Sequence, residues 1–332
     1  MKTVSRRGFL GTGAAGILAA GLPAVRTSDD SVIASATGDK YITSYYQFTE
    51  EAFKTLASMA LPNGPEYLHI FVQSAPTTLP RKHKVDLVQS AGESFKYGYA
   101  FDLHKYDWQN ATDDQLKAWA IEFRTAGLDP SATSDYFAFN EMPDEAPFHP
   151  ELRQKVARLV RYLYSAGGGP EWRGVFYFTG KNLTPATWIS RSDELWEVID
   201  DTCDLVVGER FETFNFATNH SLPDLASFFD VMPKFLANSR DPHQMRIARD
   251  KYAILHSTYY GPKSTNWAGL RDDQRSPAEL KSYLEKLVTT TRMSEFGKRR
   301  IVFSPLETMN LDERMFPVLA EVIKADRCGK RG

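Results

Sequence analysis

The chain of 332 residues has little cysteine, little net charge and, beyond its N-terminus, no long apolar run. Its two cysteines are too few for a disulfide framework, which excludes the small cross-linked secreted domains. The formal net charge of −2 excludes a strongly basic surface, so we expect no nucleic-acid partner. After residue 24 no segment is apolar over the length that a bilayer requires, so we expect no membrane span in the mature protein.

Aromatic residues, in contrast, are plentiful, at 13% of the chain, with 15 Tyr and 6 Trp. This composition is typical of a globular protein, and it is compatible with a flat, stackable ligand such as a sugar. Because no linker or low-complexity stretch divides residues 37–332, we expect a single domain there and a monomer. Cys203 and Cys328 are not in neighbouring units of the fold expected below, so we expect no disulfide between them.

The N-terminus carries a targeting pattern. Ser5-Arg6-Arg7-Gly8-Phe9-Leu10 resembles the bacterial twin-arginine signal, whose core is S-R-R-x-F-L. A Gly- and Ala-rich apolar run follows, and Ala34-Ser35-Ala36 offers an A-x-A cleavage site, with Leu22-Pro23-Ala24 as an alternative. The resemblance implies a cleaved signal over residues 1–36, the twin-arginine export machinery as a partner, and a secreted or periplasmic mature protein. The alternative is an ordinary N-terminal helix with two arginines.

One pattern then repeats eight times: a short aromatic or β-branched run, followed by a longer segment of helical period. The runs predict strands at 41–46, 67–72, 97–102, 136–140, 174–179, 204–209, 252–257 and 300–304. The longer segments predict helices at 49–61, 82–90, 112–126, 150–165, 192–201, 222–238, 277–293 and 312–326, with Thr112 in the cap of the third.

Eight such units predict an α/β fold, the (β/α)8 or TIM barrel, which is typically about 250 residues long. The strands are nearly all apolar, as expected when both faces of a parallel sheet are covered. The alternative is a doubly wound open sheet, but no glycine-rich phosphate loop follows the first strand. Gly167-Gly168-Gly169 precedes the fifth strand and is typical of a plain turn.

Polar residues gather where these strands end, and in a barrel those ends converge on one mouth. They are Gln47, Gln73, Asp102 with His104, Asn140 with Glu141, Thr179 with Lys181, Glu209 with Glu212, His256, and Glu307. The amino ends carry mostly ordinary turn residues. Because carboxylates are rarely buried without a purpose or a partner, this grouping predicts an active site at the carboxyl ends.

The fourth strand end resembles a known site. Phe139-Asn140-Glu141-Met142-Pro143 is similar to the acid/base signature of a large clan of retaining glycoside hydrolases, in which a glutamate follows an asparagine at the end of strand four. The resemblance implies that Glu141 is the proton donor and that Asn140 binds substrate. That clan places its nucleophile, a glutamate, at the end of strand seven, where this chain has His256-Ser257-Thr258-Tyr259-Tyr260 and no carboxylate.

The second carboxylate is therefore expected from strand six, which ends in Glu209, with Glu212 three residues further on. Glycoside hydrolysis needs two carboxyl groups, about 5 Å apart for retention and roughly 6.5–9.5 Å apart for inversion. Glu209 is then the nucleophile or base, and Glu212 is the reserve candidate. The alternative for Glu209 is an ion pair with Arg210 or another barrel charge.

Asp102 and His104 are two residues apart, so both can face one side of an extended chain. Either they bind substrate, or they begin a metal site with Glu141, Glu209 or His256. We favour substrate binding, because no HxH or HExxH spacing is present. Aromatic residues of the same loops would stack on sugar rings: Tyr45, Tyr46, Trp108, Trp188, Phe211, Tyr259, Tyr260 and Trp267. Glu307 either contacts substrate or caps the last helix.

The sequence thus predicts a secreted glycoside hydrolase that cleaves a polysaccharide or oligosaccharide with Glu141 as general acid/base and without a cofactor or metal. The expected catalytic residues are Glu141, Glu209 and Glu212, and the expected substrate-binding residues are Asn140, Asp102, His104, Tyr45, Trp108, His256, Tyr259 and Glu307. One alternative is a metal-dependent hydrolase or isomerase built on Asp102, His104, Glu209 and His256. Another is a barrel that binds glycans without cleaving them.

Overall fold

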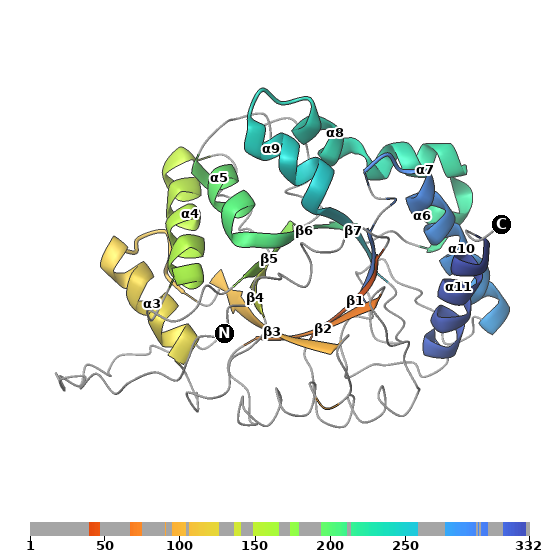
Figure 1. Cartoon of the computed structure of the whole chain (residues 1–332), viewed down its shortest axis with the longest axis horizontal. Coiled ribbons are helices and arrows are strands. Elements are labelled where there is room, and N and C mark those ends of the chain that lie inside the picture. The colour runs from red at the N-terminus through yellow and green to blue at the C-terminus, as the bar shows by residue number, and fades with distance from the viewer. Residues whose placement is uncertain are drawn as a thin grey trace, which may run out of the picture.

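A computed structural model describes residues 40–46, 67–74, 90, 95–103, 106–125, 136–140, 149–165, 173–178, 194–210, 214–257, 276–296, 298, 300–304 and 315–329. Eight parallel strands form one closed barrel in the order of the sequence, with helices around its outside (Figure 1). The barrel closes where residues 40–43 of β1 pair with residues 300–303 of β8. The predicted (β/α)8 barrel is therefore confirmed.

The strands lie where the sequence predicts them, with small differences at their ends. They are β1 Lys40–Tyr46, β2 Tyr67–Ser74, β3 Phe95–Asp102, β4 Tyr136–Asn140, β5 Gly174–Phe178, β6 Cys203–Arg210, β7 Tyr252–Ser257 and β8 Arg300–Ser304. Between β5 and β6 the register shifts, because Gly174 pairs with Cys203 whereas Val175 pairs with Leu205. Asp204 is thus an extra residue in β6, as in a β-bulge.

The described helices surround the barrel. They are α3 Asp113–Thr125, α4 Pro150–Ser165, α5 Glu194–Thr202, α6 Phe214–Asn219, α7 Leu222–Phe229, α8 Val231–Ala237, α9 Pro242–Arg246, the π-helical turn η4 Ile247–Lys251, α10 Pro277–Met293 and α11 Met315–Gly329. In Figure 1, α3, α4 and α5 follow one another on one side of the barrel, and α6, α7, α10 and α11 lie on the opposite side. None of the described helices is both long enough and apolar enough to cross a membrane.

The helix predictions are confirmed in part. Thr112 caps α3 through a reciprocal pair of hydrogen bonds with Gln115, at 3.3 and 2.8 Å. The segment predicted as one helix at 222–238 is instead two, because the chain turns at Asp230 between α7 and α8. The helices predicted at 49–61 and 82–90 lie outside the described residues, apart from Ser90, which is in a turn.

Aromatic stacking identifies the outer face of the barrel. Phe101, Phe139 and Phe176 are register neighbours on β3, β4 and β5, and their rings stack with centroids 6.4 and 4.7 Å apart. Phe101 also contacts Phe123 of α3 at 5.1 Å, edge to face. Since successive strand residues face opposite sides, the residues that alternate with these phenylalanines face the barrel interior.

The interior is also filled with buried side chains. Ala138, Tyr177, Val207 and Leu255 occupy the alternating positions of β4, β5, β6 and β7, and all are at most 1% exposed. Both faces of each strand are therefore buried, which explains why the strands are continuous apolar runs rather than alternating ones. It also means that the composition of a strand does not reveal which residues point inward.

Candidate active site

The carboxyl ends of β3 and β4 bring two predicted site residues together. Asp102 is the last residue of β3, Asn140 is the last residue of β4, and the two are register partners. Each follows a phenylalanine of the outer face, Phe101 or Phe139, so both backbone positions belong to the interior face. Neighbouring strands lie about 4.8 Å apart, so these two backbone positions are adjacent at the carboxyl end of the barrel wall.

The third predicted position of the interior face is Glu209 on β6. Its register partner on β7 is Leu255, which is buried, whereas Arg210 pairs with His256. Neighbouring strand residues belong to opposite faces, so Glu209 and Arg210 have backbone positions on opposite faces of β6. The register therefore gives Glu209 a backbone position on the same face as those of Asp102 and Asn140.

His256 corrects one prediction. Its imidazole is fully buried between the barrel and the helices, with its ring 4.8 Å from that of Phe229 of α7 and its Nε2 2.6 Å from the hydroxyl of Thr291 of α10. Thr291 donates its only hydroxyl proton to the Leu287 carbonyl at 2.8 Å, so it accepts a hydrogen bond from His256 Nε2. His256 thus faces away from the mouth, and it is lost from both the substrate-binding set and the alternative metal set.

Trp108 corrects a second prediction. It lies between β3 and α3, is 5% exposed, and belongs to the core cluster that contains Phe101, Leu103 and Phe123. A ring so deeply buried has no free face on which a sugar can stack, so Trp108 is a packing residue. Sequence alone could not distinguish the two roles, because a loop tryptophan near a barrel rim is compatible with either.

Tyr45 occupies a register position of the outer face. His256 pairs with Phe303 of β8, Phe303 pairs with Thr43 of β1, and Tyr45 lies two residues beyond Thr43. The neighbouring Tyr46 occupies the interior position instead. The remaining predicted site residues lie outside the described residues: Glu141, Glu212, His104, Tyr259 and Glu307.

The strand between β4 and β6 supplies a residue that the sequence analysis missed. Tyr177 of β5 is fully buried and belongs to the interior face, since Phe176 and Phe178 on either side of it face outward. Its register partner on β6 is Val207. It is missed because the apolar run Val175–Phe178 carries no sign of which member points inward.

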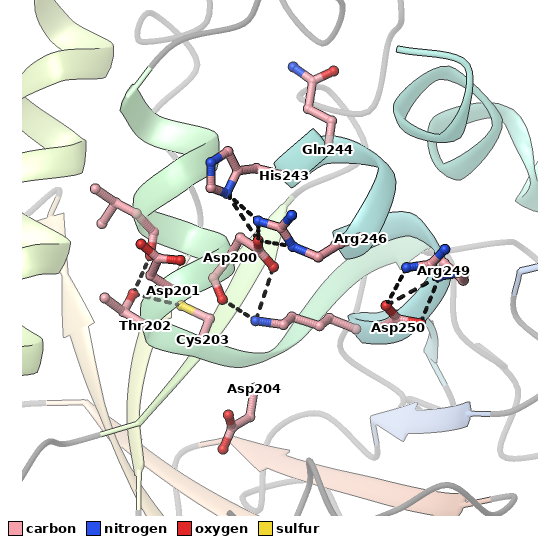
Figure 2. A network of polar contacts seen from close by, with 12 residues as sticks. Asp200, Asp201, Thr202, Cys203, Asp204, His243, Gln244, Arg246, Arg249 and Asp250 are labelled. Carbon is pink, nitrogen blue, oxygen red and sulfur yellow. Dashed lines mark hydrogen bonds and ion pairs between the residues drawn. The ribbon is translucent and has the colours of Figure 1, made fainter. Parts of the chain in front are cut away.

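The amino ends of the strands also depart from the prediction of ordinary turn residues. Asp200, near the end of α5, is 4% exposed at its side chain and contacts three basic residues (Figure 2). Its carboxylate lies 2.6 Å from Arg246, 3.0 Å from His243 and 3.2 Å from Lys251. Because α5 leads into β6 and Lys251 directly precedes β7, this network joins the amino ends of two strands, opposite the mouth.

Two further aspartates connect structural elements at the same end of the barrel. Asp204 accepts from Arg173 at 2.6 Å with its side chain 1% exposed, which joins the amino ends of β5 and β6. Asp230 accepts from the Ser294 hydroxyl and, at 3.0 Å, from the Glu295 backbone, which joins the α7–α8 turn to the end of α10. In a barrel enzyme this end serves stability rather than chemistry.

Among the described residues, the amino-end network contains the one group of carboxylate and imidazole side chains whose ligand atoms are close enough together to bind a metal ion. Asp200, Asp201 and His243 hold ligand atoms within 4.8 Å of one another. Arg246 and Lys251 already contact the Asp200 carboxylate, so a cation there would be repelled by two positive charges. Cys203, beside this group, is a free thiol whose pKa burial raises to about 12, so it is a packing residue.

Comparison with known proteins shows the fold. No protein-family model and no curated protein matches the chain. A GH18 chitinase from Pseudoalteromonas aurantia superposes with a TM-score of 0.53 at 9% sequence identity, over 85% of this chain and 99% of that one. A GH113 β-1,4-mannanase superposes with a TM-score of 0.52 at 12% identity, over 87% of this chain and 98% of that one. Both resemblances support the TIM-barrel architecture of this chain.

Proposed function

We propose that the protein is a glycoside hydrolase that cleaves a polysaccharide or oligosaccharide, with Glu141 as general acid/base and Glu209 as the second carboxylate. One observation supports this proposal above all. The closed barrel places the backbone positions of Asp102, Asn140 and Glu209 on one interior face at the carboxyl ends of the strands. Glu141 directly follows Asn140 in the chain.

The spacing of the strands suits two-carboxylate chemistry. β4 and β6 are separated only by β5, and neighbouring strands lie about 4.8 Å apart, so the two backbones are roughly 9.5 Å apart along the wall. Side chains that project from the wall towards a common axis lie closer than their backbones. The arrangement therefore admits the approximate separations of both retaining and inverting enzymes, about 5 Å and 6.5–9.5 Å.

The two structurally similar proteins suggest which substrates to test first. One is a chitinase and the other a β-1,4-mannanase, so chito- and manno-oligosaccharides are the first probes for this chain. Asp102, the register partner of Asn140, is proposed to bind a sugar hydroxyl beside the acid. A metal-dependent reaction is less well supported, because His256, one of its four proposed ligands, faces the helices.

The role of Glu141 is tested by comparing how Glu141→Gln affects the cleavage of two kinds of substrate. Glu141→Gln is expected to lower kcat on a natural oligosaccharide by about 10²–10⁴-fold, because protonation of the leaving group is lost. A dinitrophenyl glycoside needs no such protonation, so its first cleavage step is expected to be far less affected. Glu197→Gln, at an exposed position of α5, is the matched control and should retain wild-type rates on both.

Three results would count against parts of the proposal. Wild-type rates in Glu141→Gln on a confirmed oligosaccharide would remove Glu141 from the reaction. Saturable glycan binding without release of reducing ends, in the wild-type protein, would instead favour the non-catalytic barrel. If Glu209→Gln were fully active and Glu212→Gln were not, the second carboxylate would be reassigned to Glu212.

We also propose export through the twin-arginine pathway, on the basis of Ser5–Leu10. Replacing Arg6 and Arg7 by lysine should leave the full-length chain inside a bacterial host that exports the wild-type protein. Export of the double variant at the wild-type rate would refute this assignment.

A further inference from the structure

The imidazole of His243 has one nitrogen with two close partners in the Asp200 network (Figure 2). His243 and Arg246 lie three residues apart on α9, and Asp200 lies on α5. His243 Nδ1 is 3.0 Å from Asp200 Oδ2 and 2.8 Å from Arg246 Nη2. Arg246 Nη2 is in turn 2.6 Å from Asp200 Oδ2, so the three atoms are in mutual contact.

The two contacts of Nδ1 exclude each other, because a ring nitrogen has either a proton or a lone pair. A guanidinium only donates, so the contact with Arg246 requires a lone pair on Nδ1 and places the proton of the neutral ring on Nε2. A carboxylate only accepts, so the contact with Asp200 requires a proton on Nδ1. Each state of Nδ1 therefore satisfies one contact and sets two donors or two acceptors against each other in the other.

Exposure decides which basic side chain leaves when His243 is protonated. An imidazolium and a guanidinium with nitrogens 2.8 Å apart repel each other, and both donate to the same oxygen, Asp200 Oδ2. The side chain of Arg246 is 44% exposed and that of His243 is 26% exposed, so Arg246 is the more readily hydrated of the two. Protonation of His243 therefore favours release of the guanidinium.

The other charged groups that face His243 do not enter this competition. They are Asp201 on α5, Lys251 on η4 and Asp241 at the start of α9. Lys251 contacts the other oxygen of Asp200, Oδ1, and Asp241 accepts from the His243 backbone N–H at 2.8 Å. Asp201 is exposed and accepts no contact from Arg246 among the described residues. On the other elements that pack against α9, Lys234 of α8 pairs with Asp230, and Arg249 of η4 pairs with Asp250.

We propose that His243 is a proton-dependent switch in the amino-end network. In the neutral ring, Nε2 has the proton and Nδ1 accepts a hydrogen bond from Arg246. When a solvent proton bonds to Nδ1, the new N–H donates to Asp200 Oδ2 and the Arg246 guanidinium turns to solvent. α5 and α9 stay connected in both states. The junction between α9 and η4, where Arg246 lies, is tied to Asp200 only when His243 is neutral.

Nitrogen NMR of the full chain tests both states, from about pH 8 to pH 5, the range in which imidazoles ordinarily change charge. With ¹⁵N-labelled histidine and arginine, the resonances are assigned by their loss in His243→Asn and in Arg246→Lys. At the upper end we expect Nδ1 of His243 to have the chemical shift of an unprotonated nitrogen and Nε2 that of a protonated one. As His243 takes up its proton, we expect the Arg246 Nε resonance to move in step.

Two comparisons separate the switch from a general effect of pH. Arg249 donates to Asp250 at 3.1 Å, outside the Asp200 network, so its Nε resonance should not follow His243. In His243→Asn the amide oxygen can accept from Arg246 but does not titrate, so the Arg246 resonance should stay in place. A neutral ring with its proton on Nδ1, or an Arg246 resonance that does not follow His243, would overturn the proposal. If His243→Asn does not fold, His243→Gln takes its place.

Discussion

The amino-end network around Asp200 should contribute measurably to stability. Asp200 is 4% exposed at its side chain and faces Arg246, His243 and Lys251 at 2.6, 3.0 and 3.2 Å. Removing one partner of a buried charge group typically costs about 3–5 kcal/mol. Arg246 is 44% exposed and can be hydrated after the change, so we expect Asp200→Asn to lower the free energy of unfolding by about 3 kcal/mol, the lower end.

Urea unfolding followed by circular dichroism measures this loss, with Asp201→Asn as the control. Asp201 is the next residue and is exposed, so its substitution should change the free energy of unfolding by less than about 0.5 kcal/mol. Equal effects of the two variants would refute the assignment of Asp200 as the centre of the network. A clear rise in the wild-type melting temperature with added divalent metal, absent in Asp200→Asn, would show a metal site there instead.

The pH dependence gives an independent check. Burial by itself would raise the pKa of Asp200, but the charge of Lys251 and the hydrogen bonds from Arg246 and His243 outweigh it and hold the pKa below the ordinary 3.8. A carboxyl with a lowered folded-state pKa stabilises the fold above its unfolded pKa and loses that contribution as the pH falls through its folded pKa. The difference between wild type and Asp200→Asn should therefore shrink only below about pH 3.8.

Two further predictions concern the outer face of the barrel. In Gly208→Ala the new Cβ would lie 2.1 Å from the Tyr252 hydroxyl, so we expect the free energy of unfolding in urea to fall by about 1–3 kcal/mol. The double variant with Tyr252→Phe should recover part of this loss. If the effects of the two substitutions were simply additive, the clash would be contradicted. His256→Ala should lower the melting temperature, because it removes the contacts with Thr291 and Phe229, and should leave KM for a confirmed glycan unchanged. A KM raised more than about tenfold in folded His256→Ala would return His256 to the site.

The fold could be predicted from the sequence, because eight apolar runs alternate with helical segments and a run of that kind has few other interpretations. The ends of the strands could be predicted too, since a polar residue interrupts each apolar run. What could not be predicted is the face to which each end residue belongs. Glu209 and His256 both close a buried strand, yet one has an interior position and the other contacts Thr291 behind the barrel. Both faces are apolar, so the sequence shows no alternation that would separate them.

The amino-end charges were missed for a different reason. The partners of Asp200 are 43, 46 and 51 residues away along the chain, on α9 and η4, and no local pattern connects them. A sequence shows that Asp200 and Asp201 are adjacent acidic residues near a helix end. It does not show that one is buried against three bases while the other is exposed. Long-range ion pairs of this kind require the barrel to be closed before they can be recognised.

The unpredicted face of Glu209 and the unpredicted ion pairs at the amino end are connected through β6. Cys203 faces outward, since its sulfur lies against Gly174 and it belongs to the core cluster under the helices. With regular alternation from Cys203, residues 205, 207 and 209 would also face outward. The extra residue Asp204 shifts the alternation by one, so Leu205, Val207 and Glu209 belong to the interior face.

Asp204 is itself held by Arg173, which precedes β5, through contacts of 2.6 and 2.8 Å. Burial would lower the pKa of Arg173, but hydrogen bonding to Asp204 outweighs this and raises it. An ion pair at the amino end of the barrel therefore holds the irregularity that gives Glu209 a backbone position on the interior face. The backbone position of Glu209, the proposed second carboxylate, is thus set at the opposite end of its own strand, five residues earlier in the chain.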